Sequence, residues 1–585
     1  MLRSDQRSLL RVVVSALLML VLGVATIPAK PRSLKGGKVA PRTNAATTST
    51  FSNGGAIEIS ATNAGAEPEP AVPYSSDIDV IGLNGVVTAV SVTLNGLSHS
   101  SPDDLDMLLI GPSGQTFHFW SDVGGTNAVE DVSVTIADSG ASPLPDSAAI
   151  VDGQTYRPFN ADTTGDEFPV PAQGGPYNEP ASAGTATFAS VFNGLTADQV
   201  SGTWNLFVTD DTDGNGGSIA RGWSLNITTA IPATTTGQLL ISEFRLSGPA
   251  GNDDEFIEVY NATGARLTVQ SADDSSGLGI AASDGVTRCV VPNGTQIPAE
   301  GHYLCAHAGN SLLISPDATY NTGTDENVGL ALFNNSTGDS SYNLENRLDA
   351  VGSTAETDPI YKEGDGYAPV SGVSELAYSL YRDLRPAGRP KDTDDNAADF
   401  IFVATDPSGL DGQQLGAPGA ENLSSPTQQN ANFVTSLIAP CTGASNSPNR
   451  IRNLVPDTEN NSAFGTLSIR RKFTNTTQND ITQLRFRIID ITTLPAPQSV
   501  ADLRALTSSD STENDPCSPG ELIDVLGITL DGVSTQAGQP LGGGLNSTLT
   551  LASPLAPNSS VNVNFLLGVQ QTGYFRFFIN IEALP

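Results

Sequence analysis

Hydrophobic and polar residues alternate in short runs along most of the chain. Val90, Val92 and Leu94 alternate with polar residues, and the same period of two recurs at 204–208, 484–488, 561–565 and 575–581. Such alternation places one face of a strand in a core and the other in water. Clusters of Gly, Asn, Asp and Pro separate the runs. The pattern predicts an all-β protein made of β-sandwiches, with one short helix at 499–506.

Breaks in this pattern divide the chain into segments. Residues 30–50 lack periodic apolar positions and are rich in Thr and Ala, which is typical of a flexible leader. A Pro- and Thr-rich linker follows at 231–237, and a Gly-, Pro- and Ser-rich stretch lies near residue 422. We therefore expect three β-sandwich domains, which cover residues 51–230, 238–422 and 423–585.

Residues 1–29 have the pattern of a secretory signal peptide. Arg3, Arg7 and Arg11 precede an apolar stretch at 12–26, and small residues follow. An uncleaved membrane anchor is the alternative, although the stretch is short for a span of roughly 20 residues. After cleavage we expect no membrane span, and hence a protein that is secreted, extracellular or held at the cell surface.

The charge balance excludes some classes of partner. The chain has 28 Lys and Arg against 63 Asp and Glu, a formal net charge of −35. Such a chain lacks the basic face that replaces counterions on nucleic acid, and it is repelled by anionic lipid. The acidic character suits an exported protein or one that recruits cations. The 58 Gly and 38 Pro fit a chain rich in turns rather than a helical bundle.

The four cysteines allow two disulfides. An even number of Cys in an exported chain favours bridges. We expect Cys289 to pair with Cys305 and Cys441 with Cys517, because each bridge then stays inside one expected domain. Reduced, buried thiols are the alternative. No CxxC pair occurs, which argues against a zinc or redox motif.

The first expected domain contains the most specific text. VSVTLNGLSHSSPDDLDMLLIGPSGQTFHFWSD is followed by FNGLTADQVSGTWNLFVTDDTDGNGGSIARGWSLNIT. This text resembles the P/Homo B domain of kexin-like and furin-like proprotein convertases. The matching residues are His99, Asp104, Leu105, Pro112, Gly114, Gly202, Trp204, Leu206, Asp210, Gly217 and Trp223. The resemblance implies an antiparallel β-jelly-roll, which in convertases stabilises a neighbouring subtilisin-like domain.

Acidic residues of this domain are candidate metal ligands. They gather before one expected strand and in the segment DDTDGNGG, and they are Asp103, Asp104, Asp106, Asp210, Asp211, Asp213 and Asn215. Hard oxygen ligands in a Gly-rich loop suit a structural Ca²⁺ ion, which domains similar to this one often hold. An EF-hand is excluded, because its twelfth position would be Gly222 instead of Glu. The alternative is a turn with solvated Asp side chains.

The second expected domain resembles a lamin-tail domain, an immunoglobulin-like sandwich. It opens with LLISEFRLSGPAGNDDEFIEVYNATGARLTV and closes with LGAPGAEN, and the matching residues are Ile241, Ser242, Glu243, Glu255, Phe256, Ile257, Glu258, Asn261, Pro418, Gly419 and Asn422. Its glutamates are interpreted as structural instead of catalytic. The third expected domain resembles C-terminal immunoglobulin-like domains of exported bacterial proteins, and its basic spot at 470–472 is interpreted as a solvated strand face.

Catalytic motifs are missing from the sequence. The chain has four His, at 99, 118, 302 and 307, and neither a GxSxG elbow nor an HExxH motif occurs. We expect His99 to pack at a strand end, and His302 and His307 to pack locally instead of binding a metal. The sequence therefore predicts a non-catalytic binding or scaffolding protein with an unknown protein or surface ligand. The alternative is a component of a serine-type endopeptidase system, in which the partner is a protease.

Overall fold

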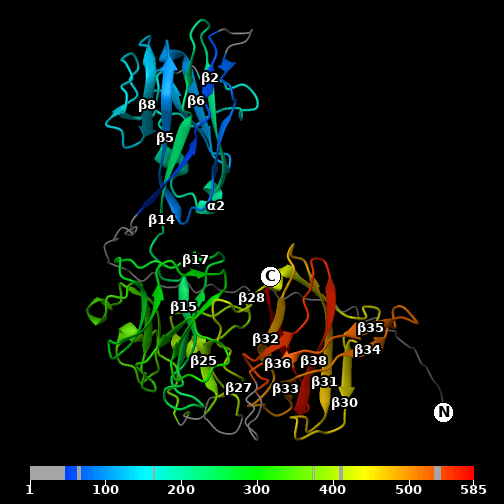
Figure 1. Ribbon diagram of the computed structural model, residues 1–585. Helices are drawn as coiled ribbons and strands as arrows, with labels where there is room; N and C mark the ends of the chain where they lie inside the picture. The colour runs from blue at the N-terminus through cyan, green and yellow to red at the C-terminus, as the bar shows by residue number, and fades with distance from the viewer. Residues whose placement is uncertain are drawn as a thin grey trace, which may run out of the picture. The chain divides into compact units, whose positions relative to one another are not determined.

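Strands dominate the protein and its helices are short (Figure 1). The computed structural model describes residues 46–585, except for 62–67, 163–164, 372, 374–375, 407–412 and 533–541. The expected signal peptide and most of the expected leader lie outside these residues. Within them the prediction of an all-β class is confirmed.

The first sandwich has two sheets. Its strands are β1 (Thr47–Asn53), β2 (Ile57–Ile59), β3 (Glu69–Pro70), β4 (Ser76–Val80), β5 (Val86–His99), β6 (Leu105–Ile110), β7 (Thr116–Ser121), β8 (Val129–Ala137), β9 (Ser142–Pro143), β10 (Thr155–Arg157), β11 (Phe159–Asn160), β12 (Gly202–Asp210), β13 (Gly217–Ile219) and β14 (Trp223–Ala230). One sheet has the order β1-β14-β5-β8-β10-β9, with β13 and β2 beside β5. The other has the order β11-β7-β6-β12-β3, with β4 beside β12. The helices η1 (Pro102–Asp104), α1 (Phe188–Phe192) and α2 (Ala197–Val200) lie in the connections.

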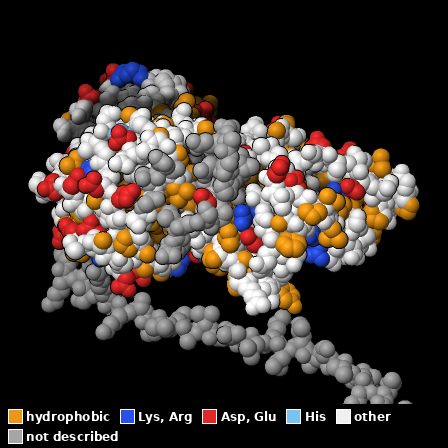
Figure 2. All heavy atoms as spheres, turned by 90° about the horizontal axis from the view of Figure 1, so that it is seen from below, with side chains coloured by type: hydrophobic (Ala, Val, Ile, Leu, Met, Phe, Trp, Pro, Cys, Tyr) orange, Lys and Arg blue, Asp and Glu red, His pale blue; other side chains and the backbone are white. Residues whose placement is uncertain are grey.

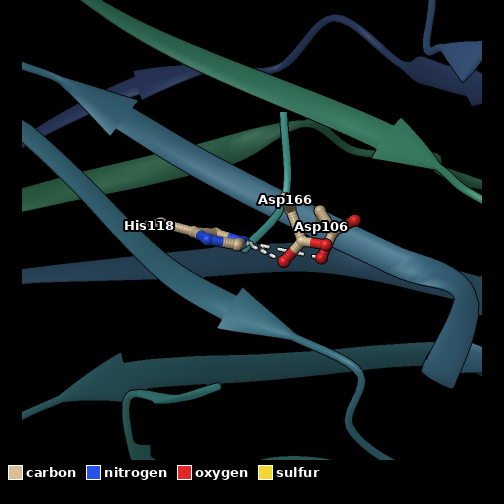
Figure 3. Close-up of side chains that lie close together, drawn as sticks. All are labelled: Asp106, His118 and Asp166. Atoms are coloured by element: carbon tan, nitrogen blue, oxygen red, sulfur yellow. Dashed lines mark ion pairs between the residues drawn. The ribbon is translucent and has the colours of Figure 1, made fainter. Parts of the chain in front are cut away.

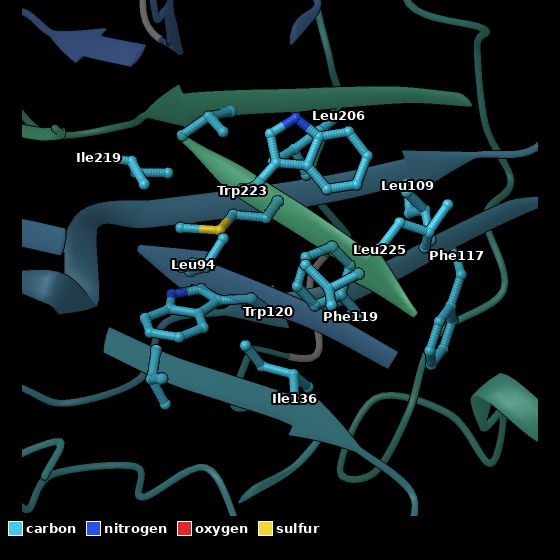
Figure 4. Packing of buried hydrophobic residues seen from close by; sticks show 14 of the residues in the cluster. Leu94, Leu109, Phe117, Phe119, Trp120, Ile136, Leu206, Ile219, Trp223 and Leu225 are labelled. Carbon is cyan, nitrogen blue, oxygen red and sulfur yellow. The ribbon is translucent and has the colours of Figure 1, made fainter. Parts of the chain in front are cut away.

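Large aromatic side chains fill the space between these two sheets (Figure 4). Trp120, Trp204 and Trp223 are fully buried, as the alternation around the latter two predicts. The indole N–H of Trp204 donates to the Val200 carbonyl, and that of Trp223 donates to the Ser76 hydroxyl. These bonds matter because a buried indole N–H without a partner is costly.

The first strand begins inside the segment that the sequence predicts as a flexible leader. β1 pairs with β14 from Thr47 to Asn53, so residues 47–50 are part of the sheet. The pairing is supported by hydroxyl groups opposite one another, such as Thr48 with Thr228 and Ser52 with Ser224. A strand held by polar cross-strand pairs shows no hydrophobic alternation, which is why the pattern does not reveal it.

The second sandwich again has two main sheets. Its elements are β15 (Leu239–Arg245), β16 (Phe256–Asn261), β17 (Leu267–Thr268), β18 (Gly277–Ala282), β19 (Thr287–Pro292), β20 (Gln296–Ile297), β21 (His302–His307), β22 (Ala318–Tyr320), β23 (Leu330–Phe333), η2 (Asp339–Ser341), β24 (Arg347–Val351), η3 (Pro359–Tyr361), β25 (Tyr378–Arg382), α3 (Asn396–Asp399), β26 (Phe400–Ala404) and β27 (Gln414–Leu415). One sheet has the order β22-β21-β16-β15-β25-β26-β27 and the other β19-β18-β23-β24. Ile257 and Val259 face the core between them.

The second sandwich contains a buried guanidinium group at the end of β25. Arg382 is 1% exposed and donates to a carboxylate oxygen of Asp349 at 2.7 Å, to one of Asp399 at 3.3 Å and to the Ile241 carbonyl at 3.0 Å. Its guanidinium carbon lies 4.9 Å from the centre of the Phe400 ring. The charge is therefore buried with its counterions, which is the condition under which a buried ion pair is tolerated.

The third sandwich is made of two five-stranded sheets and a small hairpin. Its elements are β28 (Thr427–Gln428), η4 (Asn430–Asn432), β29 (Phe433–Ser436), β30 (Arg450–Asn453), β31 (Thr466–Asn475), β32 (Gln483–Ile491), β33 (Asp502–Leu506), β34 (Ser511–Asn514), β35 (Leu522–Val525), β36 (Thr529–Leu530), β37 (Thr548–Leu551), β38 (Ser560–Gln571) and β39 (Phe577–Leu584). The sheet orders are β28-β39-β32-β37-β36 and β29-β31-β38-β33, with β30 beside β31.

The predicted helix at 499–506 is wrong. Residues 502–506 form β33, which pairs with β38 in an antiparallel register, Leu506 opposite Leu566. Ala501, Leu503 and Ala505 are buried in the sandwich core. The tertiary pairing overrides the weak local preference of a short segment.

Both predicted disulfides form. Cys289 of β19 bonds Cys305 of β21 and so joins the two sheets of the second sandwich. Cys441 bonds Cys517 in the third sandwich, where both residues lie in loops. The first bridge is buried and the second is exposed.

The surface reflects the acidic composition. In Figure 2, Asp and Glu side chains are spread over the visible face, and Lys and Arg side chains are few. Among the described residues, no helix has the length and apolar character that a membrane span needs.

Candidate metal centre

Four groups of carboxylate and imidazole side chains could hold a metal ion, among the residues that the structure describes. In each group the potential ligand atoms all lie within 4.8 Å of one another. The groups are Asp106, His118 and Asp166; Asp122, Asp162 and Asp166; Glu258, His302 and Glu421; and Asp349, Glu363 and Asp392.

Two of these groups already have arginine partners. Arg382 forms an ion pair with Asp349, and Arg487 forms one with Glu421 at 2.8 Å. Burial would raise the pKa of Glu421, but Arg487 and Arg485 lower it to about 2. These carboxylates are therefore neutralised by the protein, so a cation would have to displace an arginine to bind there.

The other two groups share Asp166 and lie on the first sandwich. No described Lys or Arg forms an ion pair with Asp106, Asp122 or Asp166. Among the described residues, the one basic side chain that forms ion pairs with them is His118, which lies 3.5 Å from Asp106 and 3.9 Å from Asp166 (Figure 3). We call the two groups together, Asp106, His118, Asp122, Asp162 and Asp166, the acidic cluster.

Two neighbouring strands hold the deepest members of the acidic cluster. In the register of β6 and β7, Asp106 lies opposite Ser121, and the pair of Leu108 and His118 follows two residues further along β6. Leu105 and Leu109 belong to the core between the sheets, whereas Leu108 packs outside it against Phe168. Asp106 shares this outer side, which the chain around Phe168 covers.

Irregular backbone supplies the remaining carboxylates. Asp122 follows β7 directly with φ 53°, a left-handed conformation that Asp tolerates better than most residues. The Ser121 hydroxyl lies 2.8 Å from a carboxylate oxygen of Asp122 and 3.0 Å from one of Asp166. One hydroxyl therefore bridges two acidic side chains that would otherwise repel each other.

Three buried ligand atoms of the acidic cluster have no hydrogen-bond partner among the residues that the structure describes. Both ring nitrogens of His118 and the Oδ1 atom of Asp106 are buried without a hydrogen-bond partner. The imidazole is fully buried, and its ring centre lies 5.1 Å from that of Phe168. Buried polar atoms are normally satisfied, so the unmet bonding capacity here is a mark of a site that takes a ligand or a proton.

The local charges shift several pKa values. Burial raises the pKa of Asp106 to about 6, and burial with the charge of Asp166 raises that of Asp122 to about 6. Burial and Asp106 likewise raise the pKa of Asp211 to about 6. Burial lowers the pKa of His118, but the nearby carboxylates of Asp106 and Glu179 outweigh this and raise it to about 9. Burial is the main cause of the raised carboxylate pKa values, and repulsion between the carboxylates adds to it; a bound cation would relieve that repulsion.

Of the seven residues that the sequence predicts as metal ligands, only Asp106 belongs to one of the four groups, although interactions link five of the seven. Asp106 belongs to the acidic cluster, and Asp211 lies near enough for Asp106 to shift its pKa. Asp210 points the other way and lies 3.1 Å from the Nε2 atom of His99, and the amide of Asn215 donates to Asp104 at 2.7 Å. The remaining two, Asp103 and Asp213, belong to none of the four groups.

Most of the acidic cluster cannot be recognised from the sequence. His118, Asp122, Asp162 and Asp166 come from a strand and from irregular segments that share no motif. The one available signal is that Asp122 follows the polar end of β7 in the text HFWSD. Asp162 and Asp166 are brought close only by the path of the chain after β11.

The other histidines and glutamates have structural partners. As expected, His99 packs at the end of β5, where its Nδ1 lies 2.8 Å from the Ser101 carbonyl. His302 lies among Glu258 and Glu421, and His307 accepts from the Gly309 N–H. In the part of the chain that the structure describes, no His ring hydrogen-bonds a Ser or Thr hydroxyl.

The three comparisons with known proteins returned nothing: no family model, no curated protein and no solved structure matches this chain.

Proposed function

We propose that this chain is an exported protein that binds other molecules through its β-sandwiches and catalyses no reaction itself. The resemblance of residues 51–230 to a P/Homo B domain and the signal-like residues 1–29 support export. The two disulfides support an oxidising compartment. Rigid sandwiches with long loops suit the presentation of binding surfaces.

The first sandwich holds a structural Ca²⁺ ion in the acidic cluster. The observation that supports this proposal is that the carboxylates lie close together and that no described Lys or Arg forms an ion pair with Asp106, Asp122 or Asp166. Asp122, Asp162 and Asp166 offer only oxygen ligands, which Ca²⁺ prefers, and the Ser121 hydroxyl adds another oxygen. The set that contains His118 would suit Zn²⁺ better, because imidazole is a favourable zinc ligand.

Thermal unfolding with and without chelator tests the calcium proposal. We expect Ca²⁺ at 100 times its dissociation constant to stabilise the first sandwich by about 2.7 kcal/mol. Asp122→Asn and Asp166→Asn should remove most of this gain. Glu130→Gln is the matched control, because it neutralises an exposed carboxylate of the same sandwich.

The metal series separates the outcomes. Stabilisation by Ca²⁺ but not by Zn²⁺ supports the oxygen-only set. Stabilisation by Zn²⁺ alone assigns the site to Asp106, His118 and Asp166 and contradicts the proposal. A melting temperature that no metal changes shows that the acidic cluster binds no metal ion, which contradicts the proposal.

The alternative function is a role in a serine-type endopeptidase system. It is supported by the resemblance to the domain that stabilises convertase proteases, and it makes the partner a protease. Incubation of the full chain with a fluorophosphonate probe tests whether this chain itself is a serine hydrolase, and co-purification of a probe-labelled protease with the chain tests the partner role. We expect no labelled Ser; covalent labelling of one Ser would replace the binding function with catalysis by this chain.

A further inference from the structure

An apolar groove opens along one side of the third sandwich. Its volume is ≈ 610 Å³ and it is lined from both sheets, mainly by aromatic and aliphatic side chains. Phe565 and Phe577 form part of its wall, with ring centres 5.7 Å apart. Phe577 and Ile579 are only half-buried, and Phe578 is 56% exposed. Core side chains of this sandwich are therefore left uncovered along the groove.

The strand beside the groove has an unpaired edge. β39 pairs with β32 along its length, but on its other side β28 covers only Glu582 and Ala583. The N–H of Ile581 donates to the Asn430 side chain on this outer side, and its carbonyl accepts from the Gln429 N–H. Backbone groups two residues apart point to the same side of a strand.

It follows that Ile579 and Phe577 direct their N–H and C=O groups to the same outer edge. On this outer side, no described strand pairs with Phe577–Ile579 of β39. Residue 576, one position before Phe577, directs its backbone groups to the inner side. The Arg576 N–H donates to the Thr492 hydroxyl and the Arg576 carbonyl accepts from the Thr492 N–H, and Thr492 follows β32. An exposed sheet edge of this kind is a ready template for another strand.

Two arginines beside the groove lack counterions. Arg450 and Arg471 line it, and no described Asp or Glu forms an ion pair with either. The adjacent Arg470, by contrast, forms an ion pair with Glu513 at 2.7 Å. Burial and the neighbouring charge of Arg450 lower the pKa of Arg471. In a chain of net charge −35, two adjacent uncompensated guanidinium groups indicate a place for a carboxylate.

We propose that the third sandwich binds an extended peptide segment of a partner protein, which adds a strand to β39 beside Phe577–Ile579 and alternates apolar with acidic side chains. Its backbone bonds the open edge, its apolar side chains fill the groove over Phe565 and Phe577, and a carboxylate meets Arg450 and Arg471. This is strand addition, in which backbone bonds supply affinity and pockets supply specificity. It gives the proposed binding function a partner class, and it does not depend on the Ca²⁺ ion.

A small amphipathic acid would share the apolar and charged contacts but would leave the strand edge unpaired. The backbone groups of Phe577 and Ile579 therefore favour a peptide. The experiment is built on that difference.

Fluorescence anisotropy on the full chain tests the proposal. The probe is a labelled eight-residue peptide that alternates Val or Phe with Asp or Thr. A second peptide carries N-methyl groups on the amides that face the edge, and a third has Lys in place of Asp. We expect the first to bind, and N-methylation to weaken binding by roughly tenfold for two lost backbone bonds. The Lys peptide should bind more weakly still.

Protein variants locate the binding. Arg450→Gln and Arg471→Gln should weaken binding of the acidic peptide and strengthen binding of the Lys peptide, because they remove the charges that attract the first and repel the second. Ser445→Trp changes an exposed residue that lines the groove, so it should block binding without disturbing the core. Arg221→Gln, in the first sandwich, is the matched control and should bind as the parent does.

The remaining outcomes overturn the proposal. Equal binding of the N-methylated peptide shows that no strand is added. Displacement of an apolar dye from the groove by laurate but not by the peptide shows that the groove takes a small amphiphile. If no peptide binds while chelator still lowers the melting temperature, the strand-addition proposal fails and the calcium proposal stands.

Discussion

The Nε2 atom of His118 lies 3.5 Å from the Oδ1 atom of Asp106, and both side chains are buried. With a pKa raised to about 9, the imidazole is protonated at neutral pH and acts as an internal cation. It therefore partly occupies, in electrostatic terms, the place that a metal ion would take.

Replacing His118 with a neutral residue should raise the affinity of the acidic cluster for Ca²⁺. If Asp122, Asp162 and Asp166 bind Ca²⁺, His118→Gln removes a repelling charge and should raise Ca²⁺ affinity by roughly fivefold, or about 1 kcal/mol at a screened distance. Isothermal titration calorimetry measures this. His307→Gln is the control and should have no effect. A fall in affinity for His118→Gln would show that the imidazole is a ligand.

The stability of the metal-free protein should fall as the pH rises from 4 to 6. The pKa values of Asp106, Asp122 and Asp211 are raised to about 6 in the folded state. The folded protein therefore binds more protons than the unfolded chain in this range, and that contribution is lost as the pH passes 6. Other groups titrate there too, so the measurement is the difference in melting temperature between the parent and Asp122→Asn.

With chelator present, the melting temperature of Asp122→Asn should rise relative to that of the parent as the pH increases from 4 to 6. Saturating Ca²⁺ should cancel or reverse the advantage, because the ion needs the ionised carboxylate. A difference that is constant with pH would mean that Asp122 titrates normally.

Loss of Arg487 should strongly destabilise the third sandwich. Its guanidinium group forms ion pairs with Glu421 at 2.8 Å and with Glu582 at 2.7 Å, and all three side chains are buried. Arg487→Met leaves Glu421 and Glu582 with Arg485 as their remaining arginine partner, so we expect a cost of about 3 kcal/mol in urea unfolding, the lower end for a broken buried ion pair. Arg576→Met, which removes an arginine that is 65% exposed, should cost less than about 1 kcal/mol.

Mild reduction should open the two disulfides in a fixed order. Cys441 and Cys517 are exposed, whereas Cys289 and Cys305 are 4% and 0% exposed. Thiol–disulfide exchange needs access to a sulfur atom, so the 441–517 bridge should open first. Alkylation with iodoacetamide followed by peptide mass spectrometry reads the order. Simultaneous opening would show that the second sandwich unfolds before its bridge is attacked.

The elements that the sequence reveals are those with a one-sided hydrophobic pattern. Trp204 and Trp223 are core residues as predicted, and both cysteine pairs form as expected. β1 is not predicted because pairs of Thr and Ser side chains hold it. β33 is not predicted because its partner β38 is distant in the sequence. Local pattern carries no information about either pairing.

The candidate site is less predictable than the fold. Asp104, Asp106 and Asp210 each lie near other Asp residues in the sequence. Strand alternation nevertheless directs Asp210 toward His99 and Asp106 toward His118 on the other face of the sheet. Asp166 joins Asp106 through an irregular segment with no periodicity. The neighbouring basic residues Arg470 and Arg471 likewise have different surroundings: Arg470 forms an ion pair with Glu513, whereas Arg471 lines the groove.

The burial of Arg382 requires distant parts of the second sandwich to assemble together. Its partners Ile241, Asp349 and Asp399 are widely spaced along the chain, and a guanidinium enclosed before they arrive would be strongly disfavoured. Partly assembled forms must keep this side chain in water and leave the core around Phe400 open. The sandwich should therefore close in a single cooperative step, with few long-lived intermediates in which half of it is dry.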